Sequence, residues 1–245
     1  MKLLSIGNSF SMDAQRWLHD IAVAHGEEIY NVDLYIGGCS LMRHWSNVET
    51  NTAGYSTYIY GVSVKRAISI AEALAMEKWD VITVQQASRD SGRPETYEPY
   101  LSNLAALIHE TNPQAQICFH QTWAYEMDST NESFGNYDYD QRKMYESIVS
   151  ASENAAKSVD AGLLPVGRVI QHLRENVPEF DYKNGGMSLC VDGCHLSLDY
   201  GRYAAAATWF ATLMKKRLSV NHIHDFDPAL IGKINATVNA LCGPC

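Results

Sequence analysis

The chain has 245 residues, of which 46% are hydrophobic and 19% are charged, and its formal net charge is −9. This length fits one large α/β unit, so we expect a single domain over residues 1–245. No apolar run reaches the roughly 18 residues that a membrane-spanning helix needs, and Lys and Arg form no basic cluster. We therefore expect neither a membrane partner nor a nucleic-acid partner.

The beginning of the chain does not resemble an export signal. A strand-like apolar segment starts at Lys2, which leaves no room for the basic, apolar and small-residue zones of a secretory leader. We expect a cytoplasmic protein, or the trimmed form of an exported one.

Apolar runs and helical periodicity alternate along the chain. Short apolar runs indicate buried strands, and apolar residues three or four positions apart indicate helices with one buried face. In chain order, the sequence predicts a strand at 2–6, a helix at 14–24, a strand at 29–36, a helix at 64–76, a strand at 81–85, a helix at 101–108, a strand at 116–120, a helix at 139–156, a strand at 162–166, and helices at 203–214 and 228–241. This alternation favours right-handed crossovers between parallel strands. The predicted fold is a three-layer α/β/α sandwich with a five-stranded parallel sheet.

Two long predicted loops, 41–61 and 123–140, are rich in aromatic residues. Aromatic rings can stack on a sugar ring, but they can equally pack a loop onto the body of the protein, and the sequence leaves both alternatives open. Trp123 and Tyr125, together with Ser88 of another loop, are our candidates for substrate contacts.

Ligands of open parallel sheets bind beyond the carboxyl ends of the strands. Ser9 lies at such a place, in the turn Gly7-Asn8-Ser9 after the first strand. It could be a nucleophile, which needs a base within hydrogen-bond reach and a third group that orients the base. It could also simply open a helix, with a serine or Asp13 as the cap.

A histidine with a nearby carboxylate occurs close to the C-terminus. Asp192 lies three residues before His195 and shortly before a predicted helix. On a loop, this spacing lets the carboxylate fold back onto the imidazole, although a pair of this kind also arises by chance. Asp192 and His195 are therefore the candidate acid and base.

Taken together, these segments resemble the SGNH (GDSL-like) hydrolase superfamily. The resemblance runs from Gly7 to the helix after His195. It rests on Gly-Asn-Ser-Phe-Ser after the first strand, Gly-Gly-Cys-Ser after the second, a polar stretch after the third, and Asp-Gly-Cys-His-Leu-Ser before the last helices. It is closest to an uncharacterised bacterial branch with Gly-Asn-Ser-Phe-Ser as the first block. The resemblance implies a flavodoxin-like sandwich and a catalytic triad of Ser9, Asp192 and His195.

The resemblance also implies an oxyanion hole, formed by backbone N–H groups of Ser9 and Gly38 and by a side-chain amide. Gly37 is an alternative match for Gly38 in the second block. The third block departs from the family, because no asparagine follows the third strand. Gln86 can supply an amide donor instead, and Ser88 or Arg89 are alternatives.

The implied activity is that of a serine-dependent carboxylic ester hydrolase. It would remove acetyl or other short acyl groups from a carbohydrate or a small-molecule ester through an acyl-enzyme, with no metal or organic cofactor. The altered third block favours an alternative, a catalytically silent carbohydrate-binding protein on the same fold.

Six cysteines are too few for a disulfide scaffold in a chain of this size. Cys190 and Cys194 flank the candidate acid and base, and could be bonded to each other or free. Cys242 and Cys245 have a redox-type spacing, and the two pairs together could hold a structural zinc. A thiol or zinc protein is thus a third hypothesis.

Overall fold

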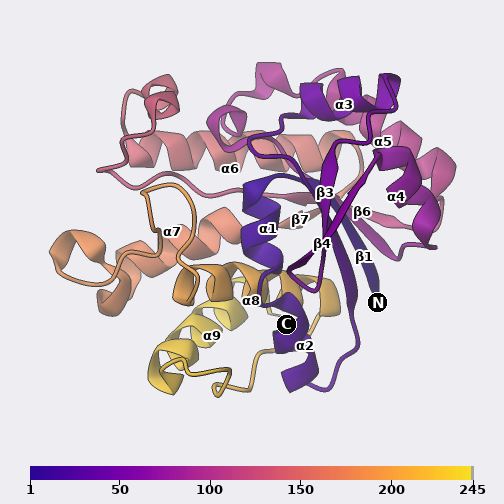
Figure 1. The fold of residues 1–245 in the computed structure, drawn as a ribbon. Helices are drawn as coiled ribbons and strands as arrows, with labels where there is room; N and C mark the ends of the chain where they lie inside the picture. The colour runs from indigo at the N-terminus through magenta and orange to yellow at the C-terminus, as the bar shows by residue number, and fades with distance from the viewer. Residues whose placement is uncertain (244–245) are drawn as a thin grey trace.

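The protein is built around one seven-stranded sheet with strand order β4-β3-β2-β1-β5-β6-β7 (Figure 1). The structure is a computed structural model that describes residues 1–243. The strands are β1 (Lys2–Gly7), β2 (Tyr30–Tyr35), β3 (Tyr55–Ile59), β4 (Val62–Ile68), β5 (Val81–Val84), β6 (Gln116–His120) and β7 (Gly162–Leu164). β1, β2, β5, β6 and β7 pair in parallel, which confirms the five predicted strands.

Helices cover both faces of the sheet, as expected for a three-layer sandwich (Figure 1). They are α1 (Ser9–Gln15), α2 (Leu18–Ala24), α3 (Leu41–Glu49), α4 (Ile70–Met76), α5 (Tyr100–Thr111), α6 (Gln141–Ser158), α7 (Val166–Asn176), α8 (Tyr200–Met214) and α9 (Pro228–Cys242). α8 packs against α1, α2, α7 and α9 on one face, whereas α3, α4 and α5 pack together on the other. Each face encloses its own buried apolar cluster. No helix within residues 1–243 is both long and apolar enough to cross a membrane.

The edge of the sheet differs from the prediction. The expected loop at 41–61 contains α3 and β3, and the expected helix at 64–76 begins as β4, an antiparallel partner of β3. Val62, Val64 and Ile68 fit a strand as well as a helix. Most of β4 is exposed on both faces of this edge strand, so no clean alternation of buried and exposed residues marks it.

Two helices also differ from their predicted bounds. The helix expected at 14–24 is split into α1 and α2 around Arg16 and Trp17, and α1 begins earlier, at Ser9. α7 was not predicted, because its first residue, Val166, reads as the end of the preceding apolar strand. The early start of α1 matters for the site, because the helix begins directly after β1 and carries Ser9 at its first position.

A buried acid lies in β2, below the carboxyl end of the sheet. Asp33 is fully buried, and its Oδ1 lies 2.8 Å from the Ser11 hydroxyl, which is also 2.9 Å from the carbonyl oxygen of Asn8. Burial raises the pKa of Asp33 to about 7, against the hydrogen bond with Ser11. Asp33 Oδ2 is buried and has no hydrogen-bond partner within residues 1–243, so an ionised Asp33 would leave part of its charge unpaired in the interior.

This carboxyl group predicts a pH-dependent stability. The pKa of Asp33 is higher in the folded protein than in the unfolded chain. Its contribution to the free energy of unfolding is therefore fully present below the unfolded pKa, and it is lost as pH rises through about 7. We expect the wild-type free energy of unfolding to fall across this window, and Asp33→Asn to flatten the fall. Urea denaturation at several pH values measures the slope. Equal slopes for the two proteins would show that Asp33 is not the titrating group.

Candidate active site

Ser9 is held at the junction between the central strand and α1. Asn8 caps the helix, with its backbone extended and its side-chain oxygen accepting a 3.0 Å hydrogen bond from the N–H of Phe10. A Cβ on Gly7 would lie 2.1 Å from Ser11 Oγ, so this sharp turn requires glycine. Ser9 is only partly buried, and its hydroxyl is thus presented at the carboxyl edge of the sheet.

The structure brings together the three residues predicted as a triad. Ser9 Oγ lies 3.0 Å from His195 Nε2, and His195 Nδ1 lies 2.7 Å from Asp192 Oδ2. Burial tends to raise the pKa of Asp192, but the hydrogen bonds from the His195 ring and from the backbone N–H groups of His195 and Cys194 lower it overall. An ionised Asp192 in this position would stabilise an imidazolium at His195.

The loop that carries Asp192 and His195 is anchored from three sides. Trp123 donates its indole N–H to the carbonyl of Cys194 at 2.8 Å, and the N–H of Glu126 donates to the carbonyl of Gly193 at 2.8 Å. On the third side, Asp13 of α1 accepts from the N–H of Leu196 at 2.9 Å. The imidazole therefore depends on residues from two other segments of the chain, the stretch from Trp123 to Glu126 and helix α1.

A chain of buried polar side chains links the ends of neighbouring strands beneath Ser9. Asn8 donates to the carbonyl of Cys39 at 3.0 Å and accepts from Gln85 at 2.6 Å, and Gln85 lies 2.7 Å from His120 Nδ1. Burial lowers the pKa of His120 to about 3, so this histidine is neutral. The network holds Asn8, and with it the turn before Ser9, in place.

Two backbone N–H groups are available for an oxyanion. Gly38 has a φ of +59°, a left-handed conformation that favours glycine, and it is exposed in the turn after β2. The N–H groups of Ser9 and Gly38 donate no hydrogen bond to any residue from 1 to 243. Cys39 O, one residue on, is tied to Asn8, which fixes this turn beside the nucleophile. The oxyanion role of Gly38 stays a prediction.

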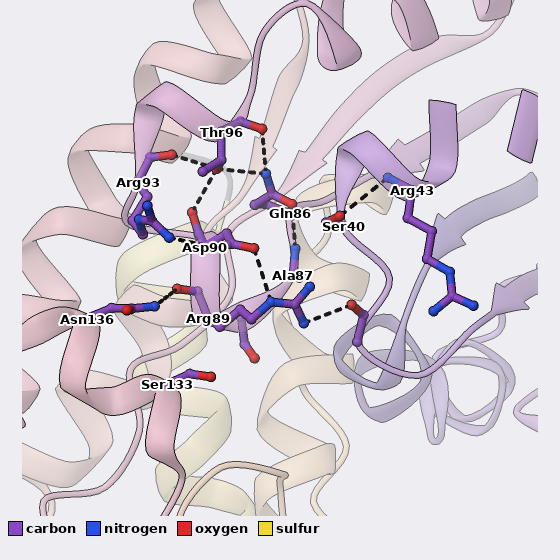
Figure 2. Close-up of polar contacts among 12 residues, drawn as sticks. Ser40, Arg43, Gln86, Ala87, Arg89, Asp90, Arg93, Thr96, Ser133 and Asn136 are labelled. Carbon is purple, nitrogen blue, oxygen red and sulfur yellow. Dashed lines mark hydrogen bonds and ion pairs between the residues drawn. The ribbon is translucent and has the colours of Figure 1, made fainter. Parts of the chain in front are cut away.

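Gln86 does not offer the free amide that the sequence suggested. Its Nε2 donates to both the carbonyl and the hydroxyl of Thr96, each at 3.0 Å, and its Oε1 accepts from the N–H groups of Leu41 and Ala87 (Figure 2). The expectation of a Gln86 donor at the oxyanion is therefore contradicted. Gln86 is buried and holds together the loops on which the site is built.

Trp123 and Tyr125 are likewise not free to stack on a ligand. Both are almost completely buried; Trp123 stacks on Phe10 with ring centroids 4.0 Å apart. The Tyr125 hydroxyl lies 2.8 Å from Ser88 Oγ. The packing alternative thus holds for both rings, and the prediction that they contact substrate is wrong. Ser88 is partly exposed, and its predicted role in substrate binding stays a prediction.

Asp13 is the functional residue that sequence reasoning passed over. It was considered only as a helix cap, yet it lies fully buried one turn after Ser9 and pairs with Arg202 at 2.9 Å. Burial raises its pKa to about 6, and Arg202 and the Leu196 N–H oppose the rise. One signal could have identified Asp13: it is an acid on the apolar face of the helix that begins with the candidate nucleophile.

The cysteines described by the structure are free thiols. Cys190 and Cys194 are buried and unbonded, and burial raises the pKa of Cys194 to about 12. Cys194 also lies near Asp192 and His195, with possible ligand atoms within 4.8 Å of one another. Both His195 nitrogens are already engaged by Ser9 and Asp192, so this cluster is better explained as the triad. Cys245 of the proposed zinc or redox pair lies outside the described residues.

Comparisons with known proteins agree with this fold. Residues 2–239 match the family model "Domain of unknown function (DUF4886)". A crystal structure of a DUF4886 family protein from Bacteroides uniformis is 37% identical, with a TM-score of 0.90 over 98% of this chain and 94% of that one. No match was found among curated protein sequences.

More distant structures share the fold. A protein from Slackia heliotrinireducens proposed to be an SGNH hydrolase is 20% identical, with a TM-score of 0.58 over 87% of this chain and 98% of that one. A variant of an acetyl-xylooligosaccharide esterase from Geobacillus is 15% identical, with a TM-score of 0.51 over 87% and 92%. The chain therefore belongs to the DUF4886 family and has the fold of the SGNH hydrolases.

Proposed function

We propose that the protein is a serine-dependent carboxylic ester hydrolase. The observation that carries this proposal is the continuous hydrogen-bond line from Ser9 through His195 to Asp192, with distances of 3.0 and 2.7 Å. This arrangement is the one that activates a serine hydroxyl at neutral pH. The fold it shares with SGNH hydrolases and esterases supports the same class of reaction.

The reaction follows from the positions of these groups. Ser9 Oγ attacks the ester carbonyl while His195 Nε2 takes its proton, and the ionised Asp192 stabilises the imidazolium. The N–H groups of Ser9 and Gly38 face the developing oxyanion. His195 then gives its proton to the leaving alcohol, and water repeats the cycle on the acyl-enzyme.

The exposure of the site supports short acyl groups on accessible esters. The side chains of His195 and Asp192 are 39% and 51% exposed, so the triad lies at the surface. The aromatic residues that could have lined an acyl pocket, Trp123 and Tyr125, are packed into the core. Acetyl or similar esters of a carbohydrate or small molecule fit such an open site, and one distant structural neighbour is an acetyl-xylooligosaccharide esterase.

One observation favours the second candidate, a catalytically silent carbohydrate-binding protein. Because Gln86 is bound to Thr96, it supplies no side-chain amide to the oxyanion, and the donors that we assign within residues 1–243 are the two backbone N–H groups of Ser9 and Gly38. The loss of one donor lowers the rate of such enzymes by about 10²- to 10³-fold, which weakens catalysis without abolishing it.

A covalent probe separates the two candidates. A fluorophosphonate should add to the wild-type protein, with the mass increase on the peptide that contains Ser9, and p-nitrophenyl acetate should be hydrolysed above the buffer rate. A silent binding protein would show neither, although it would still bind acetylated glycans. Labelling at a different residue would exclude Ser9 as the nucleophile.

A further inference from the structure

We propose that Arg89 binds a negatively charged group of the ester, so that the preferred substrates are anionic esters. This inference rests on the proposed esterase function and adds the chemical class of its substrate. It comes from the segment after β5, where the sequence departs from the related hydrolases and places an arginine near the site.

The guanidinium of Arg89 lies against the turn that borders the nucleophile. Its Nη1 donates to the carbonyl of Gly38 at 3.1 Å, and a Cβ built on Gly38 would lie 3.3 Å from the same nitrogen. Figure 2 shows the Arg89 guanidinium extended toward this turn. The next carbonyl in this turn, that of Cys39, accepts from Asn8, the neighbour of Ser9. A group held by Arg89 is therefore near an ester carbonyl placed between Ser9 and Gly38.

Much of the hydrogen-bonding capacity of Arg89 is unused. A guanidinium has five N–H donors. Besides the bond to Gly38, the only polar contact of this guanidinium within residues 1–243 is an ion pair from Nε to Asp90 at 3.3 Å, and Nη2 has no acceptor there. Asp90 is shared, because it also pairs with Arg93 at 3.2 Å. The Arg89 side chain is 44% exposed and so can receive a ligand.

The backbone of Arg89 is held in place. Its carbonyl accepts a hydrogen bond from the hydroxyl of Tyr137 at 3.1 Å. It also accepts one from the amide of Asn136 at 3.3 Å (Figure 2). Arg89 also lies within the short 3-10 helix Ser88–Asp90. A fixed backbone lowers the conformational entropy that is lost when the residue binds a ligand. Preorganised binding sites share this property.

A second cation stands on the other side of the same turn. Arg43, in the first turn of α3, is exposed and makes no ion pair with any residue from 1 to 243. Burial raises the pKa of Cys39 to about 11, and the charges of both Arg43 and Arg89 oppose that rise, so both guanidinium groups act on this turn. In a chain with a net charge of −9, Arg43 and the donors of Arg89 that are not paired with Asp90 place positive charge beside this turn, where it can attract an anion.

An anion subsite fits Arg89 better than a direct role at the oxyanion. The Nη1 that faces the turn is engaged by the Gly38 carbonyl, whereas the Nη2 donors are free. A guanidinium presents paired N–H groups that match the two oxygens of a carboxylate. The negative group can belong to the alcohol or to the acyl part of the ester, and matched substrates distinguish these two sources.

The test compares charged and neutral esters of the same shape. For the alcohol side, the pair is para-acetoxybenzoate and its methyl ester; for the acyl side, it is the p-nitrophenyl monoester of succinate and the corresponding p-nitrophenyl methyl diester. We expect wild-type kcat/KM to favour the charged member of one pair by about tenfold or more, as a charge-assisted hydrogen bond implies. The pair that shows the preference identifies the part of the substrate that carries the charge.

Variants connect this preference to Arg89. Arg89→Gln should bring the ratio of charged to neutral kcat/KM close to one, mainly through a higher KM for the charged ester. Arg89→Lys keeps the positive charge but lacks the paired N–H groups of a guanidinium, so it should give an intermediate ratio. Arg93→Gln is the matched control, because it also removes a cation paired with Asp90, and it should keep the wild-type ratio.

The outcomes separate this inference from the proposed function. Wild-type protein that hydrolyses the neutral esters but shows no preference in either pair keeps the esterase function and overturns the inference. An equal loss on charged and neutral esters in Arg89→Gln also overturns it, since Arg89 would then support the site in general. Absence of Ser9 labelling and of all turnover would overturn the esterase function itself.

Discussion

Ser9→Ala should lower kcat for ester hydrolysis by about 10⁴-fold or more and should abolish fluorophosphonate labelling. The physical reason is that Ser9 Oγ is the atom 3.0 Å from His195 Nε2, and no acyl-enzyme can form without it. Alanine removes a partly exposed hydroxyl whose only hydrogen-bond partner within residues 1–243 is His195, so the fold should be preserved. Initial rates with p-nitrophenyl acetate and intact mass after labelling measure the two effects.

Variants of the other triad residues, and of an unrelated serine, allow the loss of activity in Ser9→Ala to be compared. His195→Ala should cost about as much as Ser9→Ala, because the two groups act as one unit. Asp192→Asn should cost less, since the carboxylate orients and stabilises the ring without forming a bond to substrate. Ser46→Ala, at an exposed position of α3, is the matched serine control and should keep wild-type turnover. Wild-type turnover by Ser9→Ala or His195→Ala would refute the assigned triad.

Asp13→Ala should both destabilise the protein and slow the reaction. Its carboxylate is fully buried, accepts from the N–H of Leu196 at 2.9 Å and lies 2.9 Å from Arg202 Nε. Without it, a buried N–H loses its acceptor and a mostly buried arginine loses its counter-charge, which together cost about 3 kcal/mol of unfolding free energy. Leu196 directly follows His195, so the looser loop should also lower kcat. Urea denaturation and steady-state kinetics on the same sample measure both losses.

Two variants show whether Asp13 acts as this tether. Asp13→Asn keeps an acceptor for the Leu196 N–H while removing the charge, so it should recover part of the lost kcat. Asp20→Asn removes an acid from the neighbouring helix α2, where Asp20 pairs with His224 at the surface, and should change stability by no more than about 0.5 kcal/mol. Activity losses that are equal for Asp13→Ala and Asp13→Asn would show that the charge, and not the bond to Leu196, is what matters.

The parts of the fold that were predictable are those with strong local signals. The central parallel strands β1, β5 and β6 are buried on both faces, and such strands are short continuous apolar runs that can be recognised without tertiary information. The antiparallel strands β3 and β4 lack that signal, because β3 is only partly buried and most of the edge strand β4 is exposed. A helix and a strand were therefore equally compatible with residues 62–68.

The residues of the candidate site were also predictable only in part. Ser9, Asp192 and His195 were identified because each belongs to a short motif, and their meeting follows from the rule that sites lie at the carboxyl edge of a parallel sheet. Gln86, Trp123 and Tyr125 also follow strands, and the same rule selected them. The rule gives the position of a backbone and not the direction of a side chain, and these three side chains point into the interior.

The amino-acid sequence by itself thus determined the order of the parallel strands along the chain, the motif residues and the class of chemistry, because these depend on contacts within a few residues. Only the tertiary structure decided which polar side chains are free and which are consumed by partners. Thr96 accepts from the amide of Gln86, the Gly38 carbonyl accepts from Arg89, and Asp13 accepts from a loop 183 residues away in the chain. Hydrogen-bond partners of that kind are set by packing between distant segments, which local sequence patterns do not encode.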